Sequence, residues 1–118
     1  MEFEFKKDNN LEKRIRQYEK INKEYPTKIP IIIEKAYKSS LNTINNSKYI
    51  LSNDLTIAEF MYTIRAQLEI DEERAIFFLA KGKYILSGNE ILRDVYEKYK
   101  DNKDGFLYIS YSEELVYG

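Results

Sequence analysis

Cysteine and histidine are both absent from this chain of 118 residues. Their absence excludes disulfide bonds, a thiol nucleophile and every metal site that is built on these two ligands. It also removes the side chain that most often acts as a general base near neutral pH. The composition therefore argues against an enzyme, and the sequence predicts neither a catalytic residue nor a metal site.

Long apolar runs and an excess of one charge are missing as well. No segment has the length of a membrane span, and the N-terminus lacks the apolar core of a signal peptide. The 19 Lys and Arg residues nearly balance the 20 Asp and Glu residues, so no net field recruits nucleic acid or anionic lipid. We therefore expect a cytoplasmic protein without a nucleic-acid partner, which meets a membrane only through an attached group.

Motifs for cofactors are also scarce. The acidic run at residues 71–73 has no calcium-loop pattern around it, so a solvated turn is favoured over a metal site. Gly82 and Gly88 stand alone and form no glycine-rich loop that could cradle a phosphate. Ser39 and Ser40 have no base beside them in the sequence. The sequence predicts no cofactor.

The chain does contain enough apolar material for one globular domain. Hydrophobic residues make up 43% of it and charged residues 33%, which is typical of a folded protein. The first long element is an amphipathic helix over residues 11–25, which begins near Asn9 and Glu12 and is stopped by Pro26. A core-facing helix with a basic outer surface is favoured over a membrane-surface helix. Its apolar residues are Leu11, Ile15, Tyr18, Ile21 and Tyr25.

The order of the remaining elements predicts the fold. We expect strands over 28–34, 48–51, 75–80 and 106–111, a helix from the capping box of Thr56 and Glu59, and a short helix from Ser87 and Glu90. The order ββαβαβ is that of an α+β, ubiquitin-like β-grasp with a four-stranded mixed sheet. The antiparallel hairpin and the crossover helix place the last strand at the centre of the sheet.

The strand over residues 28–34 is apolar on both faces, because its hydrophobic residues do not alternate with polar ones. Both faces of the sheet should then be covered. The N-terminal segment is the available cover for the second face. Its first seven residues, which alternate Phe3 and Phe5 with charge, fit either a short helix or a short strand.

Residues 48–52 are the best candidate for a binding surface. This short strand follows a polar loop, which suits an exposed sheet edge that accepts a peptide as an added strand. Lys28, Lys48 and Arg65 would favour acidic partners. The alternative is that these residues are only core and scattered surface charge.

A terminal glycine, Gly118, is the second functional hint. A glycine carboxylate on a tail has no Cβ beside it, so narrow active sites can activate it and pass it to thiols and amines. The alternative is that the last residue merely happens to be glycine.

Matching strings run through the whole chain in a specific order and spacing. They are Glu12-Lys13-Arg14, Glu19-Lys20-Ile21, Tyr25-Pro26, Ile33-Glu34-Lys35-Ala36, Lys48-Tyr49, Asp54-Leu55-Thr56, Ile64-Arg65, Phe77-Phe78, Asp104-Gly105-Phe106-Leu107-Tyr108, Tyr111-Ser112 and Val116-Tyr117-Gly118. On these residues the chain resembles the GABARAP-type modifiers of the autophagy-related protein 8 family. The resemblance implies one domain over 1–118, with two added N-terminal helices over 1–26, a β-grasp core over 27–112 and a conjugation tail over 113–118.

The resemblance implies a substrate of conjugating enzymes rather than an enzyme. An E1-like enzyme would activate Gly118, and an E2-like enzyme would pass it to the amine of phosphatidylethanolamine on autophagic membranes. A cysteine protease would remove the lipid again. Receptor proteins would bind through short aromatic-x-x-aliphatic motifs beside acidic residues.

The resemblance also implies two pockets beside the strand over 48–51. The aromatic pocket would comprise Gln17, Ile21, Pro30, Ile32, Lys48, Ile50 and Phe106. The aliphatic pocket would comprise Tyr49, Leu51, Leu55, Phe60, Thr63 and Ile64. Lys28, Lys48 and Arg65 would meet the acidic flank of the motif.

Some positions depart from the family pattern. Gln17 stands where relatives carry an acidic residue, Thr63 where they carry an apolar one, and Ser52 where a proline is usual. Residues 84–88 lack the Pro-Pro of the family. Three functions stay open: a lipid-conjugated modifier, a non-conjugated adaptor that uses the same groove, and, most remotely, an enzyme on a β-grasp scaffold.

Overall fold

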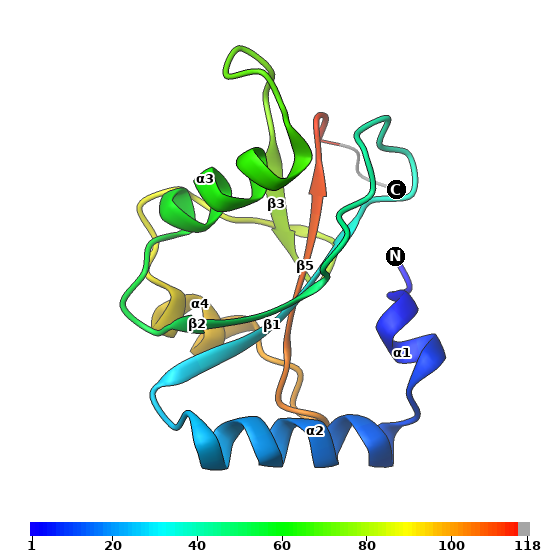
Figure 1. Cartoon of the computed structure of the whole chain (residues 1–118), viewed down its shortest axis with the longest axis vertical. Coiled ribbons are helices and arrows are strands. Elements are labelled where there is room, and N and C mark those ends of the chain that lie inside the picture. The colour runs from blue at the N-terminus through cyan, green and yellow to red at the C-terminus, as the bar shows by residue number, and fades with distance from the viewer. Residues whose placement is uncertain (116–118) are drawn as a thin grey trace.

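The computed structural model describes residues 1–115 (Figure 1). Its elements are α1 (Glu4–Asp8), α2 (Leu11–Glu24), β1 (Lys28–Lys35), β2 (Lys48–Ser52), α3 (Ile57–Leu68), β3 (Phe77–Ala80), β4 (Tyr84–Ile85), α4 (Leu92–Tyr99) and β5 (Leu107–Ser112). No helix among the described residues is long and apolar enough to cross a membrane.

The strands form one mixed sheet in the order β2-β1-β5-β3-β4. β5 lies at its centre, parallel to β1 and antiparallel to β3, as the ubiquitin-like order predicts. The prediction of four strands was one too few, because β4 adds a two-residue edge that pairs with β3. Lys81 and Gly82 adopt φ values of 56° and 74° and turn the chain back onto β3. The strand predicted over residues 75–80 ends just before this turn.

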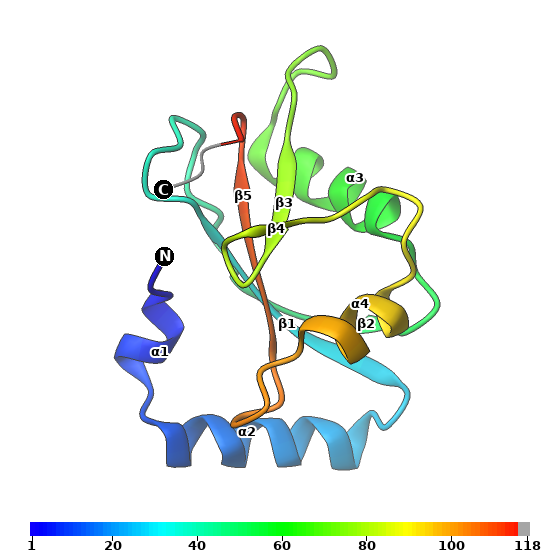
Figure 2. The same cartoon turned by 180° about the vertical axis from the view of Figure 1, so that it is seen from behind.

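β1 is buried on both faces, as its continuous apolar pattern predicts. Ile31 and Ile33 belong to a core cluster beneath α3 and α4, whereas Ile32 belongs to a second cluster beneath α1 and α2. All three side chains are fully buried. In both views β1 runs between α2 on one side and α3 on the other (Figures 1 and 2). The N-terminal segment is therefore the cover of the second face.

The first residues of the chain form a helix, which resolves the choice between helix and strand. α1 has no capping side chain of its own. Instead the Glu34 carboxylate, at the end of β1, accepts hydrogen bonds from the amides of Glu4 (2.7 Å) and Phe5 (3.0 Å). A carboxylate at a helix N-terminus satisfies free N–H groups and complements the helix dipole. Docking also buries Phe3 against Tyr108.

Two of the three predicted helix starts need correction. α3 begins at the Thr56 and Glu59 capping box, as expected, with both reciprocal hydrogen bonds present. α2 is capped by Asn10, not Asn9, because the Asn10 side chain accepts from the amide of Lys13 at 2.9 Å.

The short helix α4 begins later than its sequence suggested. Ile91 is extended and bridges to Thr56, so the helix starts only at Leu92. Ser87 and Glu90 are joined in a turn, in which the Ser87 amide donates to the Glu90 carboxylate at 2.6 Å. The carbonyl of Glu90 accepts from the amide of Ile57 and thereby ties this turn to the start of α3. The predicted helix start is in fact a turn that supports another helix.

A tight turn at Gly105 precedes β5. Gly105 has a φ of 86°, and a Cβ added there would lie 2.6 Å from the Tyr18 ring of α2. Only glycine combines this left-handed conformation with so close an approach. The turn therefore brings α2 down onto the sheet, where Tyr18 and Phe106 meet with ring centroids 6.4 Å apart.

Candidate functional site

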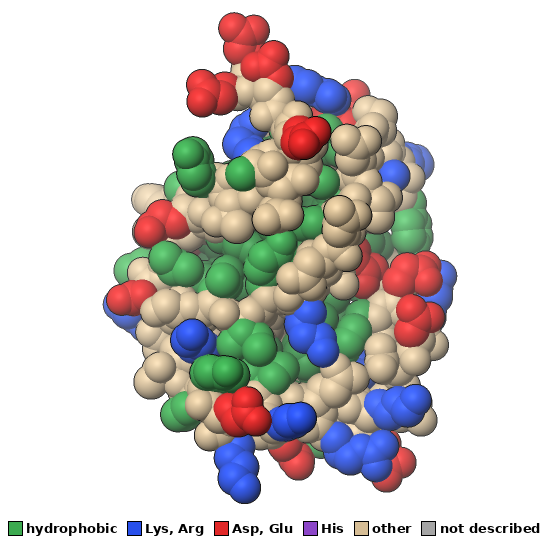
Figure 3. Space-filling view, in the orientation of Figure 1, with side chains coloured by type: hydrophobic (Ala, Val, Ile, Leu, Met, Phe, Trp, Pro, Cys, Tyr) green, Lys and Arg blue, Asp and Glu red, His purple; other side chains and the backbone are tan. Residues whose placement is uncertain are grey.

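The strand β2 is an edge of the sheet. It pairs with β1 along Lys48–Ser52, and no strand among residues 1–115 lies on its other side. On this face of the molecule, hydrophobic side chains gather between α3 and α2, with Lys and Arg side chains around the part nearer to α2 (Figure 3). A free edge beside apolar surface can accept an extended peptide by backbone hydrogen bonds.

Side chains of β2 alternate between two apolar surfaces. Tyr49 and Leu51 pack against the core cluster beneath α3, together with Leu55. Ile50 packs against the cluster beneath α2. This is the ordinary two-residue alternation of a strand. It divides the predicted residues into the same two groups that the resemblance assigned to the aliphatic and aromatic pockets.

The group on the α2 side shares one face of the sheet. The register places Pro30 opposite Ile50 and Ile32 opposite Lys48. Ile32 and Phe106 are fully buried, and Ile21 is 9% exposed. The ring of Phe5 lies edge-on against Phe106, with ring centroids 5.1 Å apart. In this structure α1 therefore covers the floor of the predicted aromatic pocket.

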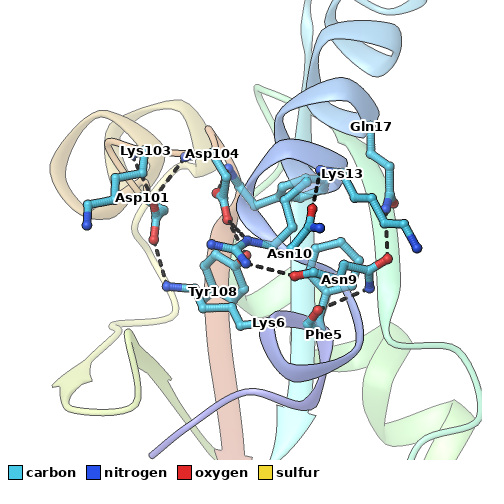
Figure 4. A network of polar contacts seen from close by, with 12 residues as sticks. Phe5, Lys6, Asn9, Asn10, Lys13, Gln17, Asp101, Lys103, Asp104 and Tyr108 are labelled. Carbon is cyan, nitrogen blue, oxygen red and sulfur yellow. Dashed lines mark hydrogen bonds and ion pairs between the residues drawn. The ribbon is translucent and has the colours of Figure 1, made fainter.

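Gln17 and Lys48 are brought into direct contact. The Lys48 Nζ donates to Gln17 Oε1 at 2.7 Å, so α2 and β2 are linked across the predicted aromatic pocket. Gln17 Nε2 donates in turn to Asn9 Oδ1 at 3.2 Å (Figure 4). The Lys48 ammonium also lies 5.6 Å from the centroid of the Phe5 ring.

The group on the α3 side is built around aromatic contacts. Tyr49 meets Phe60 edge-on, with centroids 5.5 Å apart, and burial raises the pKa of the Tyr49 hydroxyl. Phe60 and Ile64 are almost completely buried and form the floor. Thr63 is exposed on α3, and its hydroxyl donates back to the carbonyl of Glu59 at 3.4 Å.

Lys28 and Arg65, the other two cations that were predicted to meet acidic partners, contact groups outside the Gln17–Lys48 pair. Lys28 is exposed, with its Nζ 5.1 Å from the Tyr25 ring centroid, and it borders a hollow of about 190 Å³ that Pro30 also lines. The Arg65 guanidinium donates to the carbonyl of Arg74 at 2.8 Å. This contact holds Arg65 against the loop that follows α3.

Sequence reasoning missed Phe5 and Asn9 as members of the α2 side of this site. Phe5 comes from α1, and Asn9 from the junction between α1 and α2. For Phe5, the available signal was the alternation of Phe3 and Phe5 with charged residues. Nothing in the sequence indicated a role for Asn9 in binding, because its position predicted the start of a helix instead.

The predicted conjugation residue, Gly118, lies outside the described residues. Residues 113–115 are the described part of the predicted tail, and the first of them, Glu113, is held by side-chain hydrogen bonds. The Glu113 carboxylate accepts from the Ser39 hydroxyl and, at 2.9 Å, from both the amide and the hydroxyl of Ser40. Among residues 1–115, no cluster of three or more Asp and Glu side chains is arranged to hold a metal ion.

Comparison with known proteins identifies the family. The family model described as "Autophagy protein Atg8 ubiquitin like" matches residues 13–118. The chain belongs to the autophagy-related protein 8 family. Relatives include autophagy-related protein 8e of Arabidopsis thaliana, 43% identical over 97% of this chain and 92% of that protein, and autophagy-related protein 8 of Mycosarcoma maydis, 39% identical over 97% and 95%.

The solved structures agree with this assignment. A crystal structure of Trypanosoma brucei ATG8 covers 100% of both chains, with a TM-score of 0.90 and 31% sequence identity. The chain is therefore a ubiquitin-like autophagy protein. Members of the autophagy-related protein 8 family are modifiers and adaptors and not enzymes by themselves.

Proposed function

We propose that this protein is a GABARAP-type modifier whose Gly118 is joined to phosphatidylethanolamine. An E1-like enzyme activates the carboxylate, an E2-like enzyme carries it as a thioester, and a cysteine protease later releases the lipid. Conjugation places the chain on two acyl tails, each contributing about 0.8 kcal/mol per buried CH₂, which anchors it stably. The protein is then cytoplasmic before conjugation and peripheral on autophagosomal or related membranes after it.

The conjugated form recruits receptors that carry aromatic-x-x-aliphatic motifs. The observation that carries this proposal is the free edge of β2, whose side chains alternate between two apolar surfaces. A motif strand added to this edge would direct its aromatic residue toward α2 and its aliphatic residue toward α3. We propose the functional division accordingly: residues 1–26 as the N-terminal extension, 27–112 as the β-grasp core and 113–118 as the conjugation tail.

Conjugation is tested with purified E1-like and E2-like enzymes, ATP and vesicles that contain phosphatidylethanolamine. The wild-type chain should give a faster-migrating lipidated band on a urea gel, and Gly118→Ala should give none. A Leu115→Ala variant, altered near the same end, should still react. A wild-type chain that never shifts, in a reaction that conjugates a relative, leaves the non-conjugated adaptor as the function.

Motif binding is tested by calorimetry with an aromatic-x-x-aliphatic peptide. Tyr49→Ala and Leu51→Ala should each weaken binding by about 1–3 kcal/mol, as truncation of an interface hot spot does. Tyr62→Ala provides the matched control, because Tyr62 is 76% exposed on α3. Equal losses for Tyr49 and Tyr62, or no loss for either β2 variant, would refute the proposed groove.

A further inference from the structure

A relay of side-chain amides links α1 to the charged end of the β2 edge. Asn9 Nδ2 donates to the carbonyl of Phe5 at 3.0 Å. Asn9 Oδ1 accepts from Gln17 Nε2 at 3.2 Å, and Gln17 Oε1 accepts from Lys48 Nζ at 2.7 Å. Figure 4 shows Asn9 at the end of α1 and the Gln17 side chain reaching toward it from α2. Each contact of this relay pairs one donor with one acceptor.

The relay can run in one direction only. The Phe5 carbonyl is an acceptor, so Asn9 must turn its NH₂ group toward it and its oxygen toward Gln17. Gln17 must then turn its NH₂ group toward Asn9 and its oxygen toward Lys48. A reversed Gln17 amide would place a donor against the ammonium of Lys48, which has no acceptor to offer. The Phe5 carbonyl, acting through Asn9, and the Lys48 ammonium therefore require the same orientation of the Gln17 amide.

The charge of Lys48 is not neutralised by this arrangement. Its ammonium has three donors, and one of them is used by the neutral Gln17 oxygen. The Phe5 ring face nearby is attractive to a cation but carries no net charge. Among residues 1–115, every ion pair involves another cation, namely Lys6, Lys7, Arg14 or Arg16. Lys48 is thus a half-buried cation that is oriented without a carboxylate partner.

We propose that Asn9 and Gln17 are specificity-determining residues, which hold Lys48 ready for a carboxylate carried by the bound peptide. The inference rests on the proposed motif groove, since Lys48 is the first residue of the β2 edge. The partner is an acidic peptide that carries Asp or Glu beside the aromatic residue of its motif. A glutamate at position 17 would supply the carboxylate from within the protein and remove this preference.

The test compares two peptides with the same aromatic-x-x-aliphatic core, one with Asp and one with Asn beside the aromatic residue. Wild type should bind the Asp peptide about five-fold more tightly in low salt, which corresponds to an exposed ion pair. In Gln17→Glu the Asp-to-Asn affinity ratio should fall to about one, whatever the change in the absolute affinity of either peptide. Gln67→Glu makes the same charge change at an exposed position of α3 and should leave the ratio unchanged.

Asn9→Ala tests the positioning role. A loss of stability alone would weaken binding of both peptides equally, whereas a freed Gln17 amide should lower the Asp-to-Asn affinity ratio about two-fold.

Lys48→Gln should reduce the Asp-to-Asn affinity ratio to about one. This variant tests the inference if Gln17→Glu does not fold. An unchanged ratio in Gln17→Glu or in Lys48→Gln overturns the inference, and an unchanged ratio in Asn9→Ala overturns the relay. If wild type binds both peptides equally, the inference fails and the groove survives. If it binds neither, the proposed function fails.

Discussion

At the scale of single residues, the buried carboxylate of Asp104 joins α2 to β5. It accepts from Arg14 Nε at 2.8 Å, from the Tyr108 hydroxyl and from the Phe106 amide at 2.9 Å. The Asp104 side chain is fully buried, and the Arg14 side chain is 11% exposed. Burial and the neighbouring carboxylate raise the pKa of Tyr108, so its hydroxyl stays protonated as a donor. The carboxylate is stable there only because each oxygen is satisfied.

Replacing Arg14 by Leu should therefore destabilise the protein strongly. The change leaves a buried negative charge without its cation, which costs about 3–5 kcal/mol of unfolding free energy. Chemical denaturation with urea measures the loss. Arg16→Leu is the matched control, since Arg16 lies on the exposed side of the same helix and its loss should cost under about 0.5 kcal/mol. Similar losses for the two variants would contradict this account of Asp104.

A second carboxylate, that of Glu113, predicts a pH effect. Hydrogen bonds from the Ser39 hydroxyl and the Ser40 amide lower its pKa from 4.5 to about 2. A group whose pKa is lowered by folding stabilises the folded state above its unfolded pKa. That stabilisation should disappear as the pH falls from about 4.5 to about 2.

The difference in unfolding free energy between wild type and Glu113→Gln isolates this contribution from that of all other acids. We expect wild type to be the more stable form at pH 6 and the difference to shrink by pH 3. Glu114→Gln, at the neighbouring exposed position, should show no such trend. If the difference in unfolding free energy stayed constant with pH, Ser39 and Ser40 would not be stabilising the ionised form of Glu113.

At the scale of elements, two similar sequence patterns have different structural roles. Thr56 and Glu59 form a complete capping box at the start of α3. Ser87 and Glu90 have the same spacing but form a turn, because Ile91 is held extended by its bridge to Thr56. A Ser or Thr followed three residues later by Glu can form these local hydrogen bonds in either structure. The surrounding chain decides whether a helix follows.

These roles predict unequal costs of mutation. Thr56→Ala removes a helix cap and should lower the unfolding free energy by about 1 kcal/mol. Ser87→Ala removes a hydroxyl whose hydrogen-bond partner within residues 1–115 is the exposed Asn89 side chain, and it should change stability by less than about 0.5 kcal/mol. Thermal or urea denaturation of the two variants gives the comparison. A larger loss for Ser87 than for Thr56 would reverse the assignment.

At the scale of the whole molecule, the sheet is covered on both faces, and we expect both covers to be necessary for a stable fold. Ile32, Phe106 and Tyr108 form the second face and are buried by α1 and α2. A chain that starts at residue 27 should expose these apolar side chains and lose the partner of Asp104. We expect it to aggregate or to lose its cooperative unfolding transition, as measured by size-exclusion chromatography and circular dichroism. A monomeric, cooperatively folded fragment would mean that the core needs no second cover.

Much of the fold could be predicted because the responsible signals are local. The apolar run of β1, the stop at Pro26 and the Thr56 box each depend on a few adjacent residues. The short strand β4 could not be found in this way, since Tyr84 and Ile85 are both exposed and pair with β3 only after a left-handed turn. The two pockets stay a prediction from the resemblance, and the alternation along β2 places Tyr49 and Leu51 against one apolar cluster and Ile50 against the other.

The sequence by itself determined the class of fold, the order of its main elements and the absence of histidine and cysteine chemistry, because composition and periodicity act over short stretches. Only the tertiary structure decided what the first nine residues do. Glu34 caps α1 from 30 residues away, and Asn9, which the sequence assigned to a helix start, accepts a hydrogen bond from the Gln17 side chain that contacts Lys48. These roles depend on groups that meet only after the chain has folded, and no local pattern encodes such a meeting.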